Sequence, residues 1–138
     1  MTIKTIGQGL ATRLKTIADL QVFAPDELPD TPNSFPSAMI LPGNITYHLT
    51  HDEAYDIQYR LLLLFTKQDQ PSAISAMIDY MEVTGTKSIK AAIEGERILG
   101  GAAGDVQVNL NSGVGNITWG GIVYISTEFK ITVYGGTL

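Results

Sequence analysis

One segment of the sequence, residues 55–67, constrains the fold more than the rest of the chain. Its residues alternate as in a β-strand, where successive side chains point to opposite faces. One face is apolar throughout and consists of Tyr55, Ile57, Tyr59, Leu61, Leu63 and Phe65. The other face begins polar and becomes apolar at Leu62 and Leu64. A strand that is apolar on both faces needs cover on both, so we expect a helix on one face and a neighbouring subunit on the other.

The composition is that of a single globular domain, residues 1–138. A chain of 138 residues is long enough to bury a substantial core without covalent cross-links. Hydrophobic residues make up 44% of it and charged residues only 17%. There is no cysteine, which excludes disulfides, thiol nucleophiles and cysteine zinc sites.

Charge and hydropathy argue against two further classes. The 9 basic residues are scattered among 14 acidic ones, and the net charge is −5, so we do not expect tight DNA or RNA binding. The N-terminal stretch MTIKTIGQGLATRL lacks the uninterrupted apolar core of a secretory signal. The longest apolar run, residues 61–65, is too short to span a bilayer. We therefore expect a soluble protein that is made in a cytoplasm and contacts no membrane.

The first half of the chain predicts one helix and two strands before residue 67. Apolar residues spaced by three or four form a helical face, namely Ile3, Ile6, Leu10, Leu14 and Ile17. Residues 20–24 follow as a short extended segment, and four prolines make residues 25–36 an acidic, irregular loop. Residues 37–41 predict a strand that Pro42-Gly43 ends. The polar stretch 44–54 predicts the tip of a long hairpin.

The second half predicts two helices followed by strands. A helix opens at Gln70-Pro71 and ends at Gly85, and a short one covers residues 87–94 with Thr86 as N-cap. Residues 105–110 and 117–119 predict strands, and Gly120-Gly121 a two-residue hairpin turn into residues 122–134. The core face of that last strand is expected to hold Val123, Ile125, Phe129, Ile131 and Val133. The chain is thus expected to be α+β, with a mainly antiparallel four- to five-stranded sheet and helices packed on one face.

No group of residues predicts an enzyme. The cluster of His48, His51, Asp52 and Glu53 has the residue types of a metal site or a general base, but it also suits a solvated hairpin tip. Residues three apart on a strand point to opposite faces, so the two imidazoles would not converge. The run Gly85-Thr86-Lys87-Ser88 lacks the spacing and preceding strand of a phosphate-binding loop. We therefore predict no catalytic residue, no metal and no cofactor.

Several segments together resemble a known family. They are "RLKTIADLQVF", a Pro-rich acidic loop leading into "SAMILPG", "DIQYRLLLLF", "SIKAAIE", "LGGAAGDVQV" and the closing "WGGIVYISTEFKITVYG". In this order they resemble the tail terminator proteins of long-tailed bacteriophages and prophages, also called tail completion or tail-to-head joining proteins. The resemblance extends from about Leu10 to Gly135.

The resemblance implies a non-enzymatic structural protein of the virion tail, assembled in the host cytoplasm. Such a protein forms a hexameric ring on the last ring of tail-tube subunits, stops polymerisation and presents a surface to the head connector or neck protein. DNA would pass through the ring without tight binding, which suits an acidic chain.

Two sets of residues are candidate contact sites in such a ring. The two-faced strand offers a candidate subunit interface at Tyr59, Arg60, Leu62 and Leu64. Long polar loops on a rigid sheet often carry binding residues. We therefore expect the Pro-rich loop and the hairpin tip at residues 44–54 to contact the tube or connector. The candidate residues are Asp26, Glu27, Asp30, Tyr47, His48, His51, Asp52 and Glu53.

Two other functions remain open from the sequence. The chain has the size and acidity of other head–tail connector proteins, such as a stopper or neck protein. It also suits a small cytosolic ligand-binding α+β dimer, in which Trp119 and the tyrosines would line a pocket.

Overall fold

The fold is built from three helices and five strands. The computed structural model describes residues 3–17, 20–28, 36–47, 55–65, 70–95 and 105–134. The elements, in chain order, are α1 (Ile3–Leu14), β1 (Gln21–Phe23), β2 (Ser37–Tyr47), β3 (Tyr55–Phe65), α2 (Gln70–Met81), α3 (Ile89–Glu94), β4 (Asp105–Trp119) and β5 (Ile122–Tyr134).

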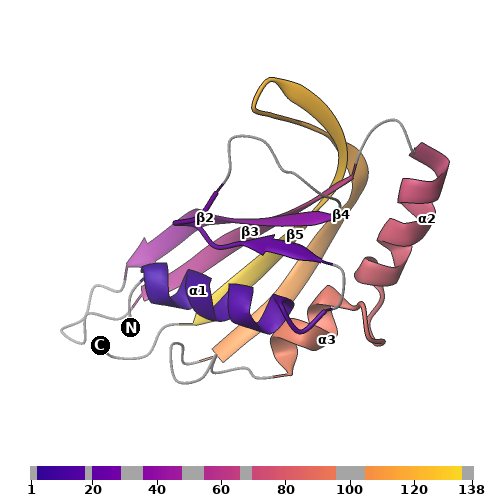
Figure 1. The fold of residues 1–138 in the computed structure, drawn as a ribbon. Coiled ribbons are helices and arrows are strands. Elements are labelled where there is room, and N and C mark those ends of the chain that lie inside the picture. Colours follow the sequence, from indigo (N-terminus) through magenta and orange to yellow (C-terminus); the bar gives the residue numbers. More distant parts are fainter. Residues whose placement is uncertain are drawn as a thin grey trace.

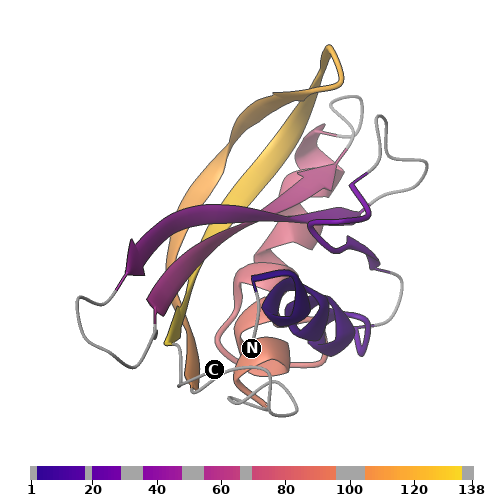
Figure 2. The same cartoon turned by 90° about the vertical axis from the view of Figure 1, so that its left-hand side faces the viewer.

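The strands form one mixed sheet in the order β1-β2-β3-β5-β4. Only the β1–β2 pair is parallel, and the other three pairs are antiparallel. The three helices pack against one face of the sheet, and Figure 2 shows them on the same side of it. The prediction of an α+β fold with a mainly antiparallel sheet is confirmed.

The main core lies between the helices and the odd-numbered face of β3. The side chains on this face of β3 are at most 1% exposed, namely Ile57, Tyr59, Leu61 and Leu63. They share the core with side chains of all three helices, namely Ile6, Leu10 and Leu14 of α1, Met77 and Tyr80 of α2, and Ile89 and Ile93 of α3. The Tyr59 hydroxyl donates a hydrogen bond to the backbone carbonyl of Ile3. This bond satisfies the one polar atom that the ring brings into the core and joins the central strand to the first turn of α1.

Two strand boundaries differ from the predictions. Pro42-Gly43 does not end β2, which runs on to Tyr47, and residues 105–119 form one strand, β4, instead of two. In both strands the pairing register shifts: between Pro42 and Ile45 in β2, and between Val108 and Val114 in β4. Such bulges absorb extra residues, so a strand can continue through residues that would otherwise break the ladder.

The β4–β5 hairpin turns at Gly120-Gly121, as predicted. Both glycines have positive φ angles, 59° and 82°, which two-residue turns of this kind require. The end of the hairpin extends past the helices (Figure 1). Val123, two residues after the turn, lies on the same face as Ile125 but is 42% exposed, because this part of the hairpin extends past the helices, so the prediction that it belongs to the core was wrong. Ile125, Phe129, Ile131 and Val133 do lie in the core.

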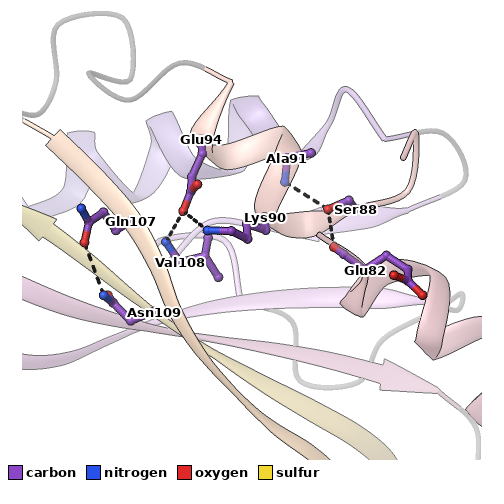
Figure 3. A network of polar contacts seen from close by, with 8 residues as sticks. All are labelled: Glu82, Ser88, Lys90, Ala91, Glu94, Gln107, Val108 and Asn109. Carbon is purple, nitrogen blue, oxygen red and sulfur yellow. Dashed lines mark hydrogen bonds and ion pairs between the residues drawn. The ribbon is translucent and has the colours of Figure 1, made fainter. Parts of the chain in front are cut away.

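Ser88 caps α3, not Thr86 as predicted. Its hydroxyl oxygen accepts a hydrogen bond from the Ala91 amide (3.1 Å) and donates one to the Glu82 carbonyl (2.6 Å), as Figure 3 shows. Ser88 is buried, so both bonds are shielded from water. We expect Ser88→Ala to lower the free energy of unfolding by about 1 kcal/mol. Urea denaturation measures this. Thr86→Ala, at an exposed position, is the control, and an equal loss in both variants would contradict the assignment of the cap.

Candidate functional site

The candidate functional surface is the sheet face that the helices leave uncovered, together with the distal part of the β4–β5 hairpin. We call residues 111–127 the hairpin arm. One half of the uncovered sheet face is apolar and the other half is polar, and each half contains residues that the sequence predicted as contacts.

The apolar half is a second core inside the single chain. Its centre consists of Met39, Leu62, Leu64 and Tyr124, with Phe23, Leu28, Leu41, Ile117 and Trp119 packed around it. Leu62 is 2% exposed and Leu64 is fully buried. The expectation that a neighbouring subunit covers these two leucines is therefore wrong, since residues of β1, β2 and the hairpin arm already cover them.

The hairpin arm reaches this second core because a built-in bulge bends it. The Asn111 side chain accepts a hydrogen bond from the Gly113 amide (2.9 Å) and donates one to the Thr127 hydroxyl (2.8 Å), which in turn donates to the Gly113 carbonyl (2.9 Å). Gly113 has a φ of 82°. Bulges sharpen the local bend of a strand, and the arm curves strongly in Figure 1. The signal for this bulge in the sequence is the turn-forming run Asn111-Ser112-Gly113.

Of the four predicted interface residues, only Arg60 has its side chain at the surface. Tyr59 lies on the opposite face from Leu62 and Leu64, beneath α1, and is fully buried. The Arg60 side chain is 47% exposed and pairs with Glu128 on β5, with Nη2 2.7 Å and Nε 3.1 Å from the same carboxylate oxygen. The Arg60 side chain also lies beside Gly43 of β2. Of the predicted subunit interface, only the Arg60–Glu128 ion pair on the polar half of the uncovered face is therefore accessible to a second chain.

We expect Arg60→Gln to have little effect on folding. Exposed ion pairs contribute at most about 1 kcal/mol to stability, so urea denaturation should give nearly the wild-type value. A subunit contact through Arg60 would instead appear as weaker assembly in light scattering. A large loss of stability would show that the Arg60–Glu128 pair is structural.

The predicted contact loops are only partly described. Asp26 and Glu27 lie at the surface after β1, and the Asp26 carboxylate accepts a hydrogen bond from Gln8 of α1 (3.2 Å) and lies 4.0 Å from the Lys4 ammonium group. Tyr47 ends β2 and is 68% exposed. The other predicted contact residues, namely Asp30, His48, His51, Asp52 and Glu53, lie outside the described residues.

The polar half of the face offers shallow hollows. Asn44, Thr46, Asp56, Gln58 and Thr132 help to line one of about 250 Å³, and Arg60, Ser112 and Glu128 help to line another of about 290 Å³. Both volumes fall below the usual range for small-molecule sites, roughly 300–1,000 Å³. Trp119 lines neither hollow and packs on the second core instead. In the described part of the chain, no three His, Cys, Asp or Glu side chains are grouped so that they could hold a metal ion.

Exposed apolar side chains concentrate on the β4–β5 hairpin. Of the exposed large hydrophobic side chains among the described residues, those on the hairpin are Leu110 (51%), Val114 (44%), Ile122 (48%), Val123 (42%) and Tyr134, whereas Tyr47, Ile78 and Val83 lie elsewhere. Scattered exposed apolar residues are ordinary, but a group on one projecting element marks an interaction surface. The hairpin is therefore the strongest candidate contact element among the described residues, and it is not one of the contact elements predicted from the sequence.

Comparison with known proteins adds no assignment. No protein-family model matches the chain, and no curated protein matches it significantly. No helix in the ranges that the structure describes combines the length and the apolar character needed to cross a membrane.

Proposed function

We propose that this chain is a tail terminator of a long-tailed bacteriophage or prophage. It assembles as a hexameric ring on the end of the tail tube, stops tube polymerisation and forms the surface that joins the head connector. Its partners are further copies of itself, the tail-tube protein and the connector or neck protein. It works in the virion tail, after assembly in the host cytoplasm.

The observation that carries this proposal is the projecting hairpin with its exposed apolar residues. Val114 and Val123 lie on one face of the hairpin arm and Ile122 on the other, as their places in the strand pairing require. A projecting element that is apolar on both faces suits burial between partners in an assembly.

The sequence resemblance supports the same function, because its motifs fall at positions that define the fold. The "ILPG" segment spans the start of the β2 bulge, "DIQYRLLLLF" is the central strand, and "SIKAAIE" is α3 with its cap. The closing "WGG" segment forms the hairpin turn. The segments that carry the resemblance thus cover the features that position the sheet, the helix layer and the arm.

Charge supports the role of DNA in the proposal. Each chain has a net charge of −5, so six copies carry a charge on the order of −30. Such a ring repels phosphates if acidic residues line its bore, which suits a channel through which DNA passes without binding.

The test is the growth of tail tubes in the presence of the protein. Purified tail-tube subunits from the same phage or prophage are polymerised with and without this protein, and tube lengths and ends are measured in electron micrographs. We expect shorter tubes with a sixfold ring at one end. Tubes that grow unchanged would overturn the proposal. Binding to the connector without any effect on tube growth would favour a stopper or neck protein, and a stable dimer whose melting temperature rises with a metabolite would favour ligand binding.

A further inference from the structure

The outer edge of the sheet at β4 is open. β4 is the last strand in the sheet order, and no strand in the described ranges pairs with its outer side. An open edge presents unpaired amide and carbonyl groups to any other strand, so proteins protect edges with charges, prolines, bulges or a covering element. β4 has one charged residue, Asp105, and no proline in its 15 residues. Charge and proline therefore give this edge little protection.

Helix α3 and the bulges protect the first part of the edge. The Glu94 carboxylate accepts a hydrogen bond from the backbone amide of Val108 (3.0 Å), as Figure 3 shows. The pairing with β5 then shifts register twice between Val108 and Val114. An irregular strand is a poor template for a further strand, so regular pairing at this edge can begin only at Val114.

Residues 114–118 form the regular part of the edge. They pair with β5 without a register shift, from Val114 opposite Thr127 to Thr118 opposite Val123. The segment Val-Gly-Asn-Ile-Thr contains no charge and no proline, and all of its residues except Ile117 are exposed. It is the part of β4 to which a further strand can be added.

The hairpin turn determines which backbone groups of this segment face outward. In a two-residue turn such as Gly120-Gly121, the flanking residues Trp119 and Ile122 lie opposite each other and exchange backbone hydrogen bonds. Such bonds alternate along an antiparallel pair. Counting back from Trp119, every second residue therefore turns its amide and carbonyl groups toward β5. The residues between them turn these groups outward, namely Val114, Asn116 and Thr118.

The outward residues are spaced symmetrically about Asn116, so the segment can pair with a second copy of itself. A twofold axis at Asn116 brings this residue opposite Asn116 of the second copy and brings Val114 opposite Thr118 on either side. These are three pairs, and each exchanges two hydrogen bonds, which gives six. A twofold axis at Val114 would bring the bulge into the contact, and an axis at Thr118 would bring in the turn.

The side chains also fit this arrangement. On one face of the paired strands the exposed Val114 lies beside Thr118 of the second copy, and the two Asn116 amides lie beside each other, where each can donate to and accept from the other. On the opposite face Ile117 lies beside Gly115, which has no side chain to collide with it. Because the segment is uncharged, no like charges meet.

We propose that the free protein forms a twofold dimer through residues 114–118, with Asn116 opposite Asn116 of the second copy. The contact uses the same patch on both copies, so it closes at two chains and does not extend into a fibre. Five residues from each chain are far fewer than the roughly 20–30 of a standard interface, so we expect a weak dimer that dissociates on dilution. The proposal concerns the chain before assembly and does not depend on the proposed function.

Single cysteines test the register. The chain contains no cysteine, so one introduced cysteine can form a disulfide only with a second chain. Residues paired by hydrogen bonds have Cα atoms about 5.5 Å apart, within the range for a disulfide. We expect Asn116→Cys to give a disulfide-linked dimer on mild oxidation, as seen in non-reducing gel electrophoresis. Thr118→Cys is the matched control, because the two Thr118 residues would lie four residues apart along the strands, about 14 Å. Equal cross-linking of both variants would contradict the pairing.

Opposite charges at Asn116 test the twofold axis. Asn116→Lys and Asn116→Asp each place two like charges opposite each other, so each variant should need at least a tenfold higher concentration than the wild type to dimerise, as measured by light scattering. An equimolar mixture should restore the dimer. Ser75→Lys, at an exposed position of α2, is the control and should dimerise like the wild type. The proposal is wrong if Asn116→Lys dimerises as readily as the wild type, or if the mixture stays monomeric.

Hydrogen exchange separates the dimer from the proposed ring. As the protein concentration rises, the amides of Val114, Asn116 and Thr118 should exchange more slowly, whereas those of Gly115 and Ile117, already bonded within the hairpin, should change little. If the protein dimerises in this way but tubes grow unchanged, the dimer stands and the terminator function fails. If tubes are capped but the free protein is monomeric at every concentration, the dimer is overturned and the proposed function stands.

Discussion

Leu64→Asp is expected to unfold a large fraction of the protein at room temperature. Leu64 is fully buried in the second core, against Met39, Leu62 and Tyr124. An aspartate there would have to keep its carboxylate unpaired among apolar side chains or take up a proton, and either outcome costs several kcal/mol. Domains of this size are stable by only about 5–15 kcal/mol. The loss should appear in urea denaturation and as a circular dichroism spectrum of reduced structure.

Val123→Asp is the matched control for this substitution. Val123 is 42% exposed on the hairpin arm, so its replacement should change the free energy of unfolding by less than about 1 kcal/mol. The comparison also tests where the cover of Leu64 comes from. If Leu64→Asp were less stable than the wild type only at concentrations where wild-type subunits associate, a second chain, not the hairpin arm, would be covering the face.

Gly43→Ala is expected to destabilise the protein by about 1–3 kcal/mol. A Cβ atom at position 43 would lie 2.5 Å from the backbone carbonyl oxygen of Gln58 on β3, far closer than atoms tolerate. The obstacle is backbone in the centre of the sheet, so relief requires a shift of the β2 bulge and not the rotation of a side chain. Thermal or urea denaturation measures the loss.

Gly115→Ala is the control for the change in backbone entropy. A Cβ atom at position 115 meets no atom within 4 Å, so alanine is tolerated there and can even stabilise the strand. Equal stability of the two variants would show that the β2 bulge yields easily. In that case the close approach to Gln58 would not explain why glycine occupies position 43.

Most of the local structure could be predicted because apolar residues recur in the sequence at the regular spacing of a helix or a strand. The odd-numbered face of β3, the helix around Leu10 and the Gly120-Gly121 turn follow from spacing and turn chemistry, and all three are present. The bulges in β2 and β4 could not be predicted in this way, because a register shift depends on the partner strand. Residues 42–47 and 111–116 were therefore assigned to loops or omitted.

The candidate site was less predictable than the fold. Periodicity showed correctly that Leu62 and Leu64 need cover, but it could not show which segment provides it. The cover comes in part from Ile117 and Trp119, which follow in sequence long after β3 and reach it only because the arm bends at Gly113. The exposed apolar group on the hairpin and the open edge of β4 arise from the same arrangement, so no local pattern could reveal them.

The place of β5 between β3 and β4 also determines when this protein can fold during synthesis. Of the described strands, β5 leaves the ribosome last, yet it is the strand that joins the β4 hairpin to the rest of the sheet. Until it emerges, one edge of β3 and the apolar residues on both faces of that strand remain without their final partners. Pairing of distant segments is slow compared with local contacts, so the nascent chain carries this strand without its final partners while the second half of the chain is synthesised.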